Sequence, residues 1–234
     1  MYNQIKDCSD LFINNLRETL TETNEIDFKT ACSKYFADVL GTCFYGLQMN
    51  IIEDETSAFH KYGKKLIDAN IASNAFIMFT GGLETLSSSM SFRLYELSLK
   101  KHIQDKARNE IRCKLSQHGG SITNDFLSEL SYLGMIINEY YSDPEVFDPK
   151  RFSPKKKING LNGTYIPFGN GPRMCFAKRF VSVTLKIVLI EVLSKYEVEP
   201  NERIQIPITF DKGSLVVLPE SEVQLRLKLM MITR

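Results

Sequence analysis

The sequence predicts a mainly α-helical fold with a small β element near the C-terminus. Apolar residues recur at helical spacing through the first 140 residues, and glycines and prolines interrupt this pattern over residues 140–174. A long apolar helix and a few strand-like clusters follow. The chain has 234 residues, 43% of them hydrophobic, which is enough to bury a sizeable core.

The apolar periodicity places the helices in order along the chain. We expect helices over residues 5–20, 27–44, 56–67, 70–99, 101–115, 124–138 and 175–196. Asp27 is a suitable N-cap for the second of these, Gly46 closes it, and Gly119-Gly120 separates the fifth from the sixth. Apolar clusters typical of short strands lie at residues 204–206, 215–218 and 223–230.

Composition and charge exclude several classes of function. The net charge is +1 and the charge run Lys155-Lys156-Lys157 is best explained as a solvated loop, so no nucleic-acid partner is expected. The five cysteines are odd in number and form no C-x-x-C pair, which indicates reduced thiols rather than a disulfide scaffold. The three histidines are not at ligand spacing with the cysteines, which disfavours a zinc site.

The N-terminus shows no signal peptide or membrane anchor, because the chain opens on the polar run Met1-Tyr2-Asn3-Gln4. The most apolar stretch, residues 180–193, is interrupted by Lys186 and Glu191 and therefore indicates a core helix. The sequence predicts a soluble or peripherally bound chain.

Ten residues from Phe168 to Ala177, Phe-Gly-Asn-Gly-Pro-Arg-Met-Cys-Phe-Ala, carry the clearest chemical pattern. They place Cys175 behind a turn shaped by glycine and proline, at the start of a long apolar helix. Backbone N–H groups and the positive helix end would hold a thiolate there, which suits a soft axial ligand for haem iron. A buried structural thiol and a phosphate cradle are the alternatives, and the second lacks a Walker lysine.

These ten residues resemble the Phe-x-x-Gly-x-Arg-x-Cys-x-(Gly/Ala) pattern of the cytochrome P-450 family, the haem-thiolate monooxygenases, at every fixed position. At average amino-acid usage, a chain of this length would match by accident roughly once in several thousand cases. The resemblance implies a haem cofactor with Cys175 as the proximal iron ligand. It also implies that Arg173 contacts a haem propionate, that Phe168 supports the thiolate, and that Gly171 lets the backbone approach the porphyrin.

A second motif, Gly81-Gly82-Leu83-Glu84-Thr85, lies in the middle of the long helix expected at residues 70–99. Each mid-helix glycine costs about 1 kcal/mol relative to alanine, so a packing or functional reason is expected. The motif resembles the (Ala/Gly)-Gly-x-(Asp/Glu)-Thr motif of the family's distal helix. This implies that the glycines open a groove for dioxygen and that Glu84 and Thr85 deliver protons for O–O cleavage. The alternative is a kinked core helix with a solvent-facing Glu84.

A third match is partial. Residues 132–139 resemble the family helix that normally continues Glu-x-x-Arg, and residues 148–152 resemble its Pro-x-Arg-Phe segment. Glu139 and Arg151 are present, but no glutamate in the chain has an arginine three residues later. Loss of one member of a buried charge network typically costs about 3–5 kcal/mol. The alternative is that Glu139 and Arg151 are exposed and contribute little.

The resemblance covers the chain in blocks and implies an incomplete cytochrome P-450 fold, a single partial domain over residues 1–234. The blocks are residues 1–68 before the substrate roof, residues 70–139 with the distal helix, and residues 140–234 with the haem-ligand loop, the proximal helix and C-terminal strands. Residues 36–46 resemble insect-type microsomal members most. Family segments are skipped near residues 68–71 and 139–140, and the anchor, first sheet and Trp-x-x-x-Arg contact have no counterpart. We therefore expect an internally and N-terminally truncated chain.

The resemblance implies a monooxygenase that inserts one oxygen atom from O2 into a small hydrophobic organic substrate. Electrons would come from an NADPH-dependent reductase at the cytosolic face of the endoplasmic reticulum membrane. Lys178 and Arg179 would help to dock the reductase, or would simply be a solvated helix end. Two alternatives stay open: a truncated non-catalytic remnant with weak or no haem binding, and a different helical binding module with a chance match.

Overall fold

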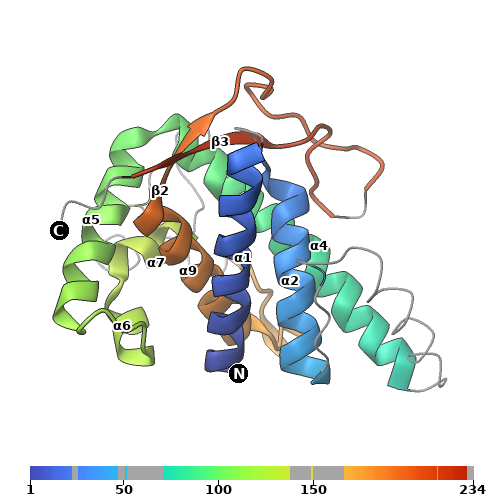
Figure 1. Ribbon diagram of the computed structural model, residues 1–234. Helices are drawn as coiled ribbons and strands as arrows, with labels where there is room; N and C mark the ends of the chain where they lie inside the picture. The colour runs from blue at the N-terminus through green and yellow to red at the C-terminus, as the bar shows by residue number, and fades with distance from the viewer. Residues whose placement is uncertain are drawn as a thin grey trace. The chain divides into compact units, whose positions relative to one another are not determined.

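The computed structural model describes residues 1–22, 26–46, 51, 71–137, 149, 166–214 and 216–230. It is mostly helical with a small antiparallel sheet, which confirms the expected fold class (Figure 1). The chain divides into two compact units, one made of Met1–Leu99 with Lys195–Arg234 and the other of Lys100–Ser194. That the whole chain forms a single partial domain stays a prediction.

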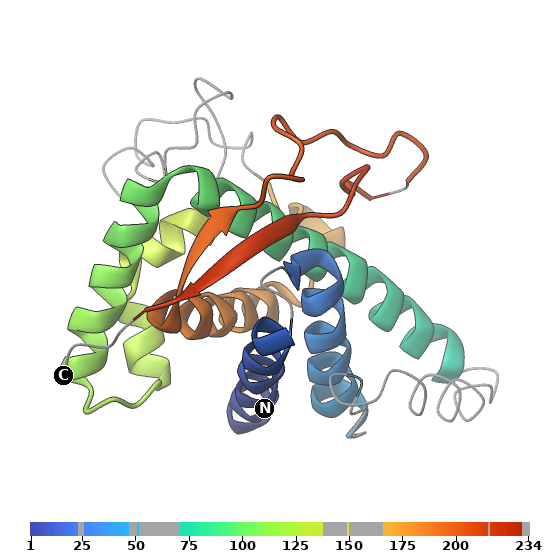
Figure 2. The same ribbon diagram turned by 45° about the horizontal axis from the view of Figure 1, so that its top comes forward.

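The first unit begins with a pair of helices, α1 (Tyr2–Glu22) and α2 (Phe28–Tyr45), which lie side by side (Figures 1 and 2). Both were expected from the apolar spacing. Their contact includes the rings of Phe12 and Tyr35, with centroids 5.2 Å apart, and a 2.9 Å hydrogen bond between the hydroxyls of Ser9 and Tyr35. The buried face of α1 is formed by residues at helical spacing: Ile5, Cys8, Phe12, Ile13 and Leu16.

The ends of α2 agree with the sequence prediction. The Asp27 side chain accepts hydrogen bonds from the backbone N–H groups of Lys29 and Thr30, so it is the N-cap. Gly46 closes the helix at φ +63°, in the left-handed region that glycine adopts readily.

The longest helix, α4 (Ile71–Leu99), packs against α2. Its bounds agree with the expected helix at residues 70–99. At Gly82 of α4, an added Cβ atom would lie 3.2 Å from Leu40 Cδ1 of α2. The absence of a side chain at Gly82 therefore allows these two helices to pack closely.

The sheet of the first unit contains three antiparallel strands in the order β1 (Ile26–Asp27), β3 (Gln224–Leu229), β2 (Tyr196–Pro200). In Figure 2 the two longer strands, β2 and β3, run alongside each other. Alternate residues are buried, namely Tyr196 and Val198 on β2 and Leu225 and Leu227 on β3. The expected strand at residues 223–230 is confirmed, whereas β1 and β2 were not predicted.

The segment between β2 and β3 differs from the prediction. Residues 204–206 form no strand, and of residues 215–218 the described ones form none either. Instead Phe210 pairs with Pro219 in an isolated bridge, and the Phe210 ring packs edge-on against Phe92 of α4 at 5.6 Å. Two backbone hydrogen bonds flank this bridge, from the Asp211 N–H to the Leu218 carbonyl and from the Glu220 N–H to the Thr209 carbonyl, so the pairing is too short to form a strand.

The second unit contains α5 (Lys101–Gln117), α6 (Asn124–Glu129), α7 (Ser131–Ile137), a short 3-10 helix η3 (Gly171–Arg173) and most of α9 (Lys178–Lys195). The C-terminal half of α9 is buried on all sides. The buried Arg108 of α5 donates from Nε to the Leu193 carbonyl, 3.0 Å away, and from its terminal nitrogens to Gln104 and Asp105. The Leu193 carbonyl lies in the last turn of α9 and has no hydrogen-bond donor within the helix, so the Arg108 guanidinium supplies one.

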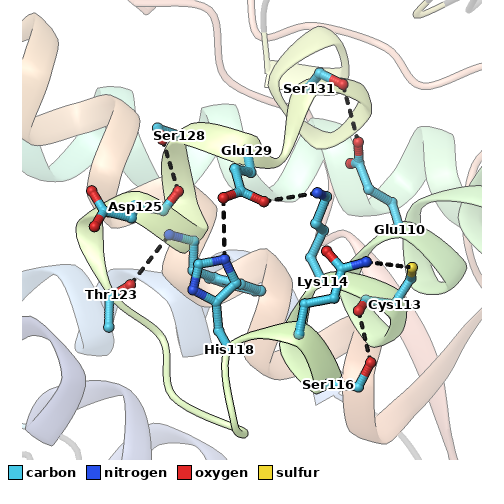
Figure 3. Close-up of polar contacts among 12 residues, drawn as sticks. Glu110, Cys113, Lys114, Ser116, His118, Thr123, Asp125, Ser128, Glu129 and Ser131 are labelled. Atoms are coloured by element: carbon cyan, nitrogen blue, oxygen red, sulfur yellow. Dashed lines mark hydrogen bonds and ion pairs between the residues drawn. The ribbon is translucent and has the colours of Figure 1, made fainter.

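The helix predicted at residues 124–138 is wrong as a single element, because it is broken at Leu130 into α6 and α7. At the break, backbone N–H and carbonyl groups lose their helical hydrogen bonds, and side chains of other helices bond to them instead. The Glu110 carboxylate of α5 accepts from the N–H groups of Tyr132 and Leu133, each at 2.8 Å, and from the Ser131 hydroxyl (Figure 3). Lys186 Nζ of α9 donates to the Leu127 carbonyl of α6 at 2.6 Å. These are tertiary contacts, which the local sequence pattern does not contain.

Several sequence predictions lie outside the described residues. They include the helix at residues 56–67, the lysine run 155–157, Glu139 and Arg151. All five cysteines are free thiols. Among the helices that the structure describes, none is both long and apolar enough to cross a lipid bilayer.

Candidate functional site

Cys175 lies in a loop of the second unit that folds back on itself. A turn from Ile166 to Gly169 is closed by a 2.8 Å backbone hydrogen bond, and η3 follows. The Cys175 N–H then donates to the Phe168 carbonyl at 2.7 Å. This bond fixes the backbone of the cysteine beside Phe168, seven residues earlier in the chain.

Two glycines give the loop its shape. Gly169 and Gly171 have φ values of +72° and +78°, in the region that residues with a Cβ rarely adopt. A Cβ on Gly169 would also lie 3.6 Å from Met174 Cα, whereas a Cβ on Gly171 would meet nothing within 4 Å among the described residues. A distance of 3.6 Å is an ordinary contact, so the loop favours glycine at both positions because of their positive φ values rather than because of crowding.

Asn170 has a structural role that the sequence analysis missed. Its side-chain oxygen accepts a 2.8 Å hydrogen bond from the Gly171 N–H, and Pro172 occupies the first turn of η3. An asparagine shortly before a proline is a recognised sign of a helix N-terminus, so the sequence contained this signal.

The helix after Cys175 starts later than expected. α9 begins at Lys178, and the N–H groups of Met174 and Cys175 bond to carbonyls of the loop rather than into the helix. The first helical bond runs from the Val181 N–H to the Ala177 carbonyl at 2.9 Å. Cys175 thus precedes the helix by three residues. The effect of the helix dipole falls off within one turn, so it acts on the Cys175 thiol less than the sequence predicted.

The side chains of the loop have the chemistry that a haem requires on its ligand side. Cys175 is a free, half-buried thiol, and Arg173 is exposed two residues before it. Phe168 is half-buried, with Lys178 Nζ 6.0 Å from the centre of its ring. A thiolate is an established axial ligand for haem iron, and a guanidinium pairs well with a propionate. The thiol, the guanidinium and the aromatic ring of this loop therefore fit a haem.

Glu84 and Thr85 are neighbours on α4 in the first unit. The exposed Thr85 hydroxyl donates to the Gly81 carbonyl at 2.6 Å and lies 3.2 Å from the Gly82 carbonyl. Glu84 is half-buried, and its Oε2 atom is out of contact with solvent and has no hydrogen-bond partner in the described structure. Glu84 therefore has an oxygen available to a further partner.

The two glycines of this motif differ in their surroundings. Gly82 is pressed against Leu40, which supplies a packing reason for it. A Cβ on Gly81 would meet nothing within 4 Å among the described residues, so packing does not account for this glycine. The open space beside Gly81 is compatible with the groove that the family resemblance implies.

The structure brings the expected site residues together in two groups. Phe168, Gly171, Arg173 and Cys175 share one loop of the second unit, and Glu84 and Thr85 share one helix turn of the first unit. The third expected group, Glu139 and Arg151, lies outside the described residues.

Comparison with known proteins identifies the family of this chain. The family model described as cytochrome P-450 matches residues 56–140 and 138–227, which is more than half of the chain. These two stretches meet at residues 138–140, where the sequence analysis places a junction between family segments.

Individual relatives carry the same family name. Cytochrome P-450 3A18 of Rattus norvegicus is 30% identical over 228 residues, covering 79% of this chain and 45% of that protein. Cytochrome P-450 6l1 of Blattella germanica is 31% identical over 194 residues, covering 62% of this chain and 39% of that protein. A probable cytochrome P-450 6a14 of Drosophila melanogaster is 22% identical over 345 residues, covering 91% of this chain.

The chain is shorter than these relatives. It spans less than half the length of the Rattus norvegicus and Blattella germanica proteins. The alignment with the Drosophila melanogaster protein runs over 345 residues, although this chain has only 234. That alignment therefore includes segments of the relative that have no counterpart here.

Proposed function

We propose, because this chain belongs to the cytochrome P-450 family, that it holds a haem through Cys175 and serves the insertion of one oxygen atom from O2 into an organic substrate. The observation that carries the proposal is the loop in which the Cys175 N–H is bonded to the Phe168 carbonyl while the thiol stays free. The bound haem would supply the oxygen and electron chemistry. The substrate class proposed is a small hydrophobic organic molecule.

Four residues of the loop would bind and orient the haem. Cys175 would supply the thiolate to the iron, and Arg173 would pair with a propionate through its exposed guanidinium. Gly171 would allow the loop backbone to approach the porphyrin, since no atom of the described residues lies within 4 Å of its Cβ position. Phe168 would support the thiolate, with its carbonyl fixing the backbone of the cysteine.

Glu84 and Thr85 would deliver protons. The hydrogen of the Thr85 hydroxyl is engaged by the Gly81 carbonyl, which leaves the lone pairs of Oγ1 to accept a hydrogen bond from water. Glu84 Oε2 can take up a proton and release it to such a water. Because adjacent residues of a helix do not face each other, a bound water would carry the proton between the two side chains.

An NADPH-dependent reductase at the cytosolic face of the endoplasmic reticulum would be the electron donor, as family membership suggests. Lys178 and Arg179 are exposed at the start of α9 and could contribute to its docking through their charge. This surface lies next to the cysteine in sequence.

A second candidate is a non-catalytic, truncated remnant that binds haem weakly or not at all. It is supported by the segments of the Drosophila melanogaster protein that have no counterpart within this chain. An active site that lacks covering segments excludes water poorly, which disfavours oxygen activation.

The experiment that tests the proposal is a haem titration of the purified chain followed by absorbance. We expect saturable binding of one haem, weakened at least about tenfold in Cys175→Ala, which corresponds to losing roughly 1.4 kcal/mol of binding free energy. Cys113→Ala is the matched control, because Cys113 is an exposed free thiol far from the loop in sequence. Equally weak, non-saturating binding in all three proteins would contradict the proposal and favour the remnant.

A further inference from the structure

Four hydroxyl groups of α4 bond to backbone carbonyls of the preceding helix turn. Thr85, Ser87 and Ser91 each donate to the carbonyl four residues earlier, at 2.6–2.8 Å, and Ser98 donates to the carbonyl of Tyr95. Serine and threonine commonly satisfy their hydroxyls in this way inside helices. Ser88 is only 3% exposed, yet its Oγ has no hydrogen-bond partner in the described structure.

A second polar atom without a partner lies one helix turn away. Glu84 Oε2 is also buried and unpaired within the described residues. Residues four apart on a helix lie on the same face with Cβ atoms about 5–6 Å apart, a separation that one water molecule can bridge with two hydrogen bonds. Gly81, on the same face, has open space where a side chain would be.

Buried hydroxyl and carboxylate oxygens without a partner are rare in folded proteins, and ordered water usually accounts for them. Glu84 Oε2 and Ser88 Oγ lie on adjacent turns of one helix face, so a single bound water can form a hydrogen bond to each of them. We propose that a bound water bridges Glu84 Oε2 and Ser88 Oγ, and that Ser88 is thereby a positioning residue for the Glu84 carboxyl group.

The role assigned to this water rests on the proposed function. In that context Ser88 lengthens the proton path of Glu84 and Thr85 by one helix turn along α4. The water holds the carboxyl oxygen in one orientation and can exchange a proton with it. The water site itself exists without haem.

The sign of a stability change tests the site in the haem-free 234-residue chain. If the Ser88 hydroxyl had no partner, Ser88→Ala would raise the unfolding midpoint, because it removes a buried unpaired group and introduces a better helix former. With a bridging water, we expect the midpoint to fall by about 2–4 °C, the size expected for losing one buried hydrogen bond in a chain of this length. Ser91→Ala is the matched control and leaves the midpoint unchanged or higher, because Ser91 bonds only to its own helix.

A double-mutant cycle with Glu84→Gln extends the test. The shifts of Ser88→Ala and Glu84→Gln are expected to be non-additive, because both side chains bond the same water and the amide holds it less strongly than the carboxylate does. The infrared carboxyl band that disappears in Glu84→Gln should also shift in Ser88→Ala and stay in place in Ser91→Ala. A raised midpoint in Ser88→Ala, additive shifts, or an unmoved carboxyl band would overturn the proposal.

These outcomes are independent of haem binding. Failure of the haem titration would contradict the proposed function and leave the water site standing. Failure of the stability and infrared measurements would remove Ser88 from the proton path and leave Cys175 as the haem ligand.

Discussion

Gly81 and Gly82 are adjacent on α4, yet their different surroundings give them different structural roles. The sequence indicates only that both glycines cost helix stability and that a reason for them must exist. The structure gives that reason for Gly82, which contacts Leu40, and finds no packing reason for Gly81 among the described residues. A sequence pattern cannot make this distinction, because it depends on the partner helix.

We expect alanine substitutions at Gly81 and Gly82 to change the free energy of unfolding differently. Gly81→Ala should raise the free energy of unfolding by about 1 kcal/mol, since alanine is the better helix former and meets open space. Gly82→Ala should gain less or lose stability, because its Cβ would lie 3.2 Å from Leu40 Cδ1 and overpacking offsets the gain. Urea unfolding of both variants measures the difference, and equal stabilisation would contradict the packing assigned to Gly82.

The polar side chains around α7 give a second contrast between neighbouring residues. Glu110 accepts from two backbone N–H groups at the start of α7, whereas Glu129 pairs at the surface with Lys114 at 2.7 Å and with His118 at 3.3 Å (Figure 3). The hydrogen bond from Lys114 lowers the pKa of the Glu129 carboxyl. Helix caps contribute more to stability than exposed ion pairs do.

Glu110→Ala should therefore lower the free energy of unfolding by about 1–2 kcal/mol, because the N–H groups of Tyr132 and Leu133 lose their partner. Glu129→Ala, in the same part of the molecule, serves as the control and should change stability little. Thermal unfolding monitored by circular dichroism compares the two. A larger loss in Glu129→Ala would show that the Glu110 cap has been misjudged.

Helices with a clear apolar period were predictable, and only some of their boundaries depended on contacts outside the helix itself. The bounds of α4 and the caps of α2 follow from local residues, and the sequence predicts them closely. The break at Leu130 depends on Glu110 and Lys186, which lie on other helices. The late start of α9 depends on the hydrogen bond from Cys175 to Phe168, and β1 is too short to leave a pattern.

Lys186 gives the break between α6 and α7 a testable pH dependence. Burial lowers the pKa of its ammonium group from the usual 10.5, and the nearby Glu110 carboxylate opposes this. A base with a lower pKa in the folded state binds fewer protons there than in the unfolded chain. The free energy of unfolding therefore rises with pH between the two pKa values.

The stability of the wild type relative to Lys186→Met should thus increase as the pH rises toward 10.5. The neutral amine can still donate to the Leu127 carbonyl, whereas methionine cannot. Urea unfolding of both proteins at several pH values from about 7 to about 10 gives this difference. A difference that stays constant or decreases with pH would contradict the buried position of this ammonium group.

For the molecule as a whole, the family and the fold class were predictable from the sequence. The pattern from Phe168 to Ala177 and the mostly helical periodicity pointed to a cytochrome P-450, and the family match and the observed elements confirm both. Local motifs suffice for this because the loop from Ile166 to Cys175 is fixed by its own glycines and by backbone hydrogen bonds within it. The Ser88 site was not predictable, because burial and unpaired atoms appear only in the folded structure.

The ligation of haem by Cys175 is tested most directly by the absorption spectrum of the reduced, CO-bound chain after loading with haem. We predict a thiolate-type Soret band in the wild type and in Cys113→Ala, and its loss in Cys175→Ala. The Cys113 variant controls for the removal of a thiol elsewhere, since that cysteine is exposed and free. A spectrum like that of free haem in the wild type, or the same Soret band in the wild type and Cys175→Ala, would contradict the assignment of Cys175.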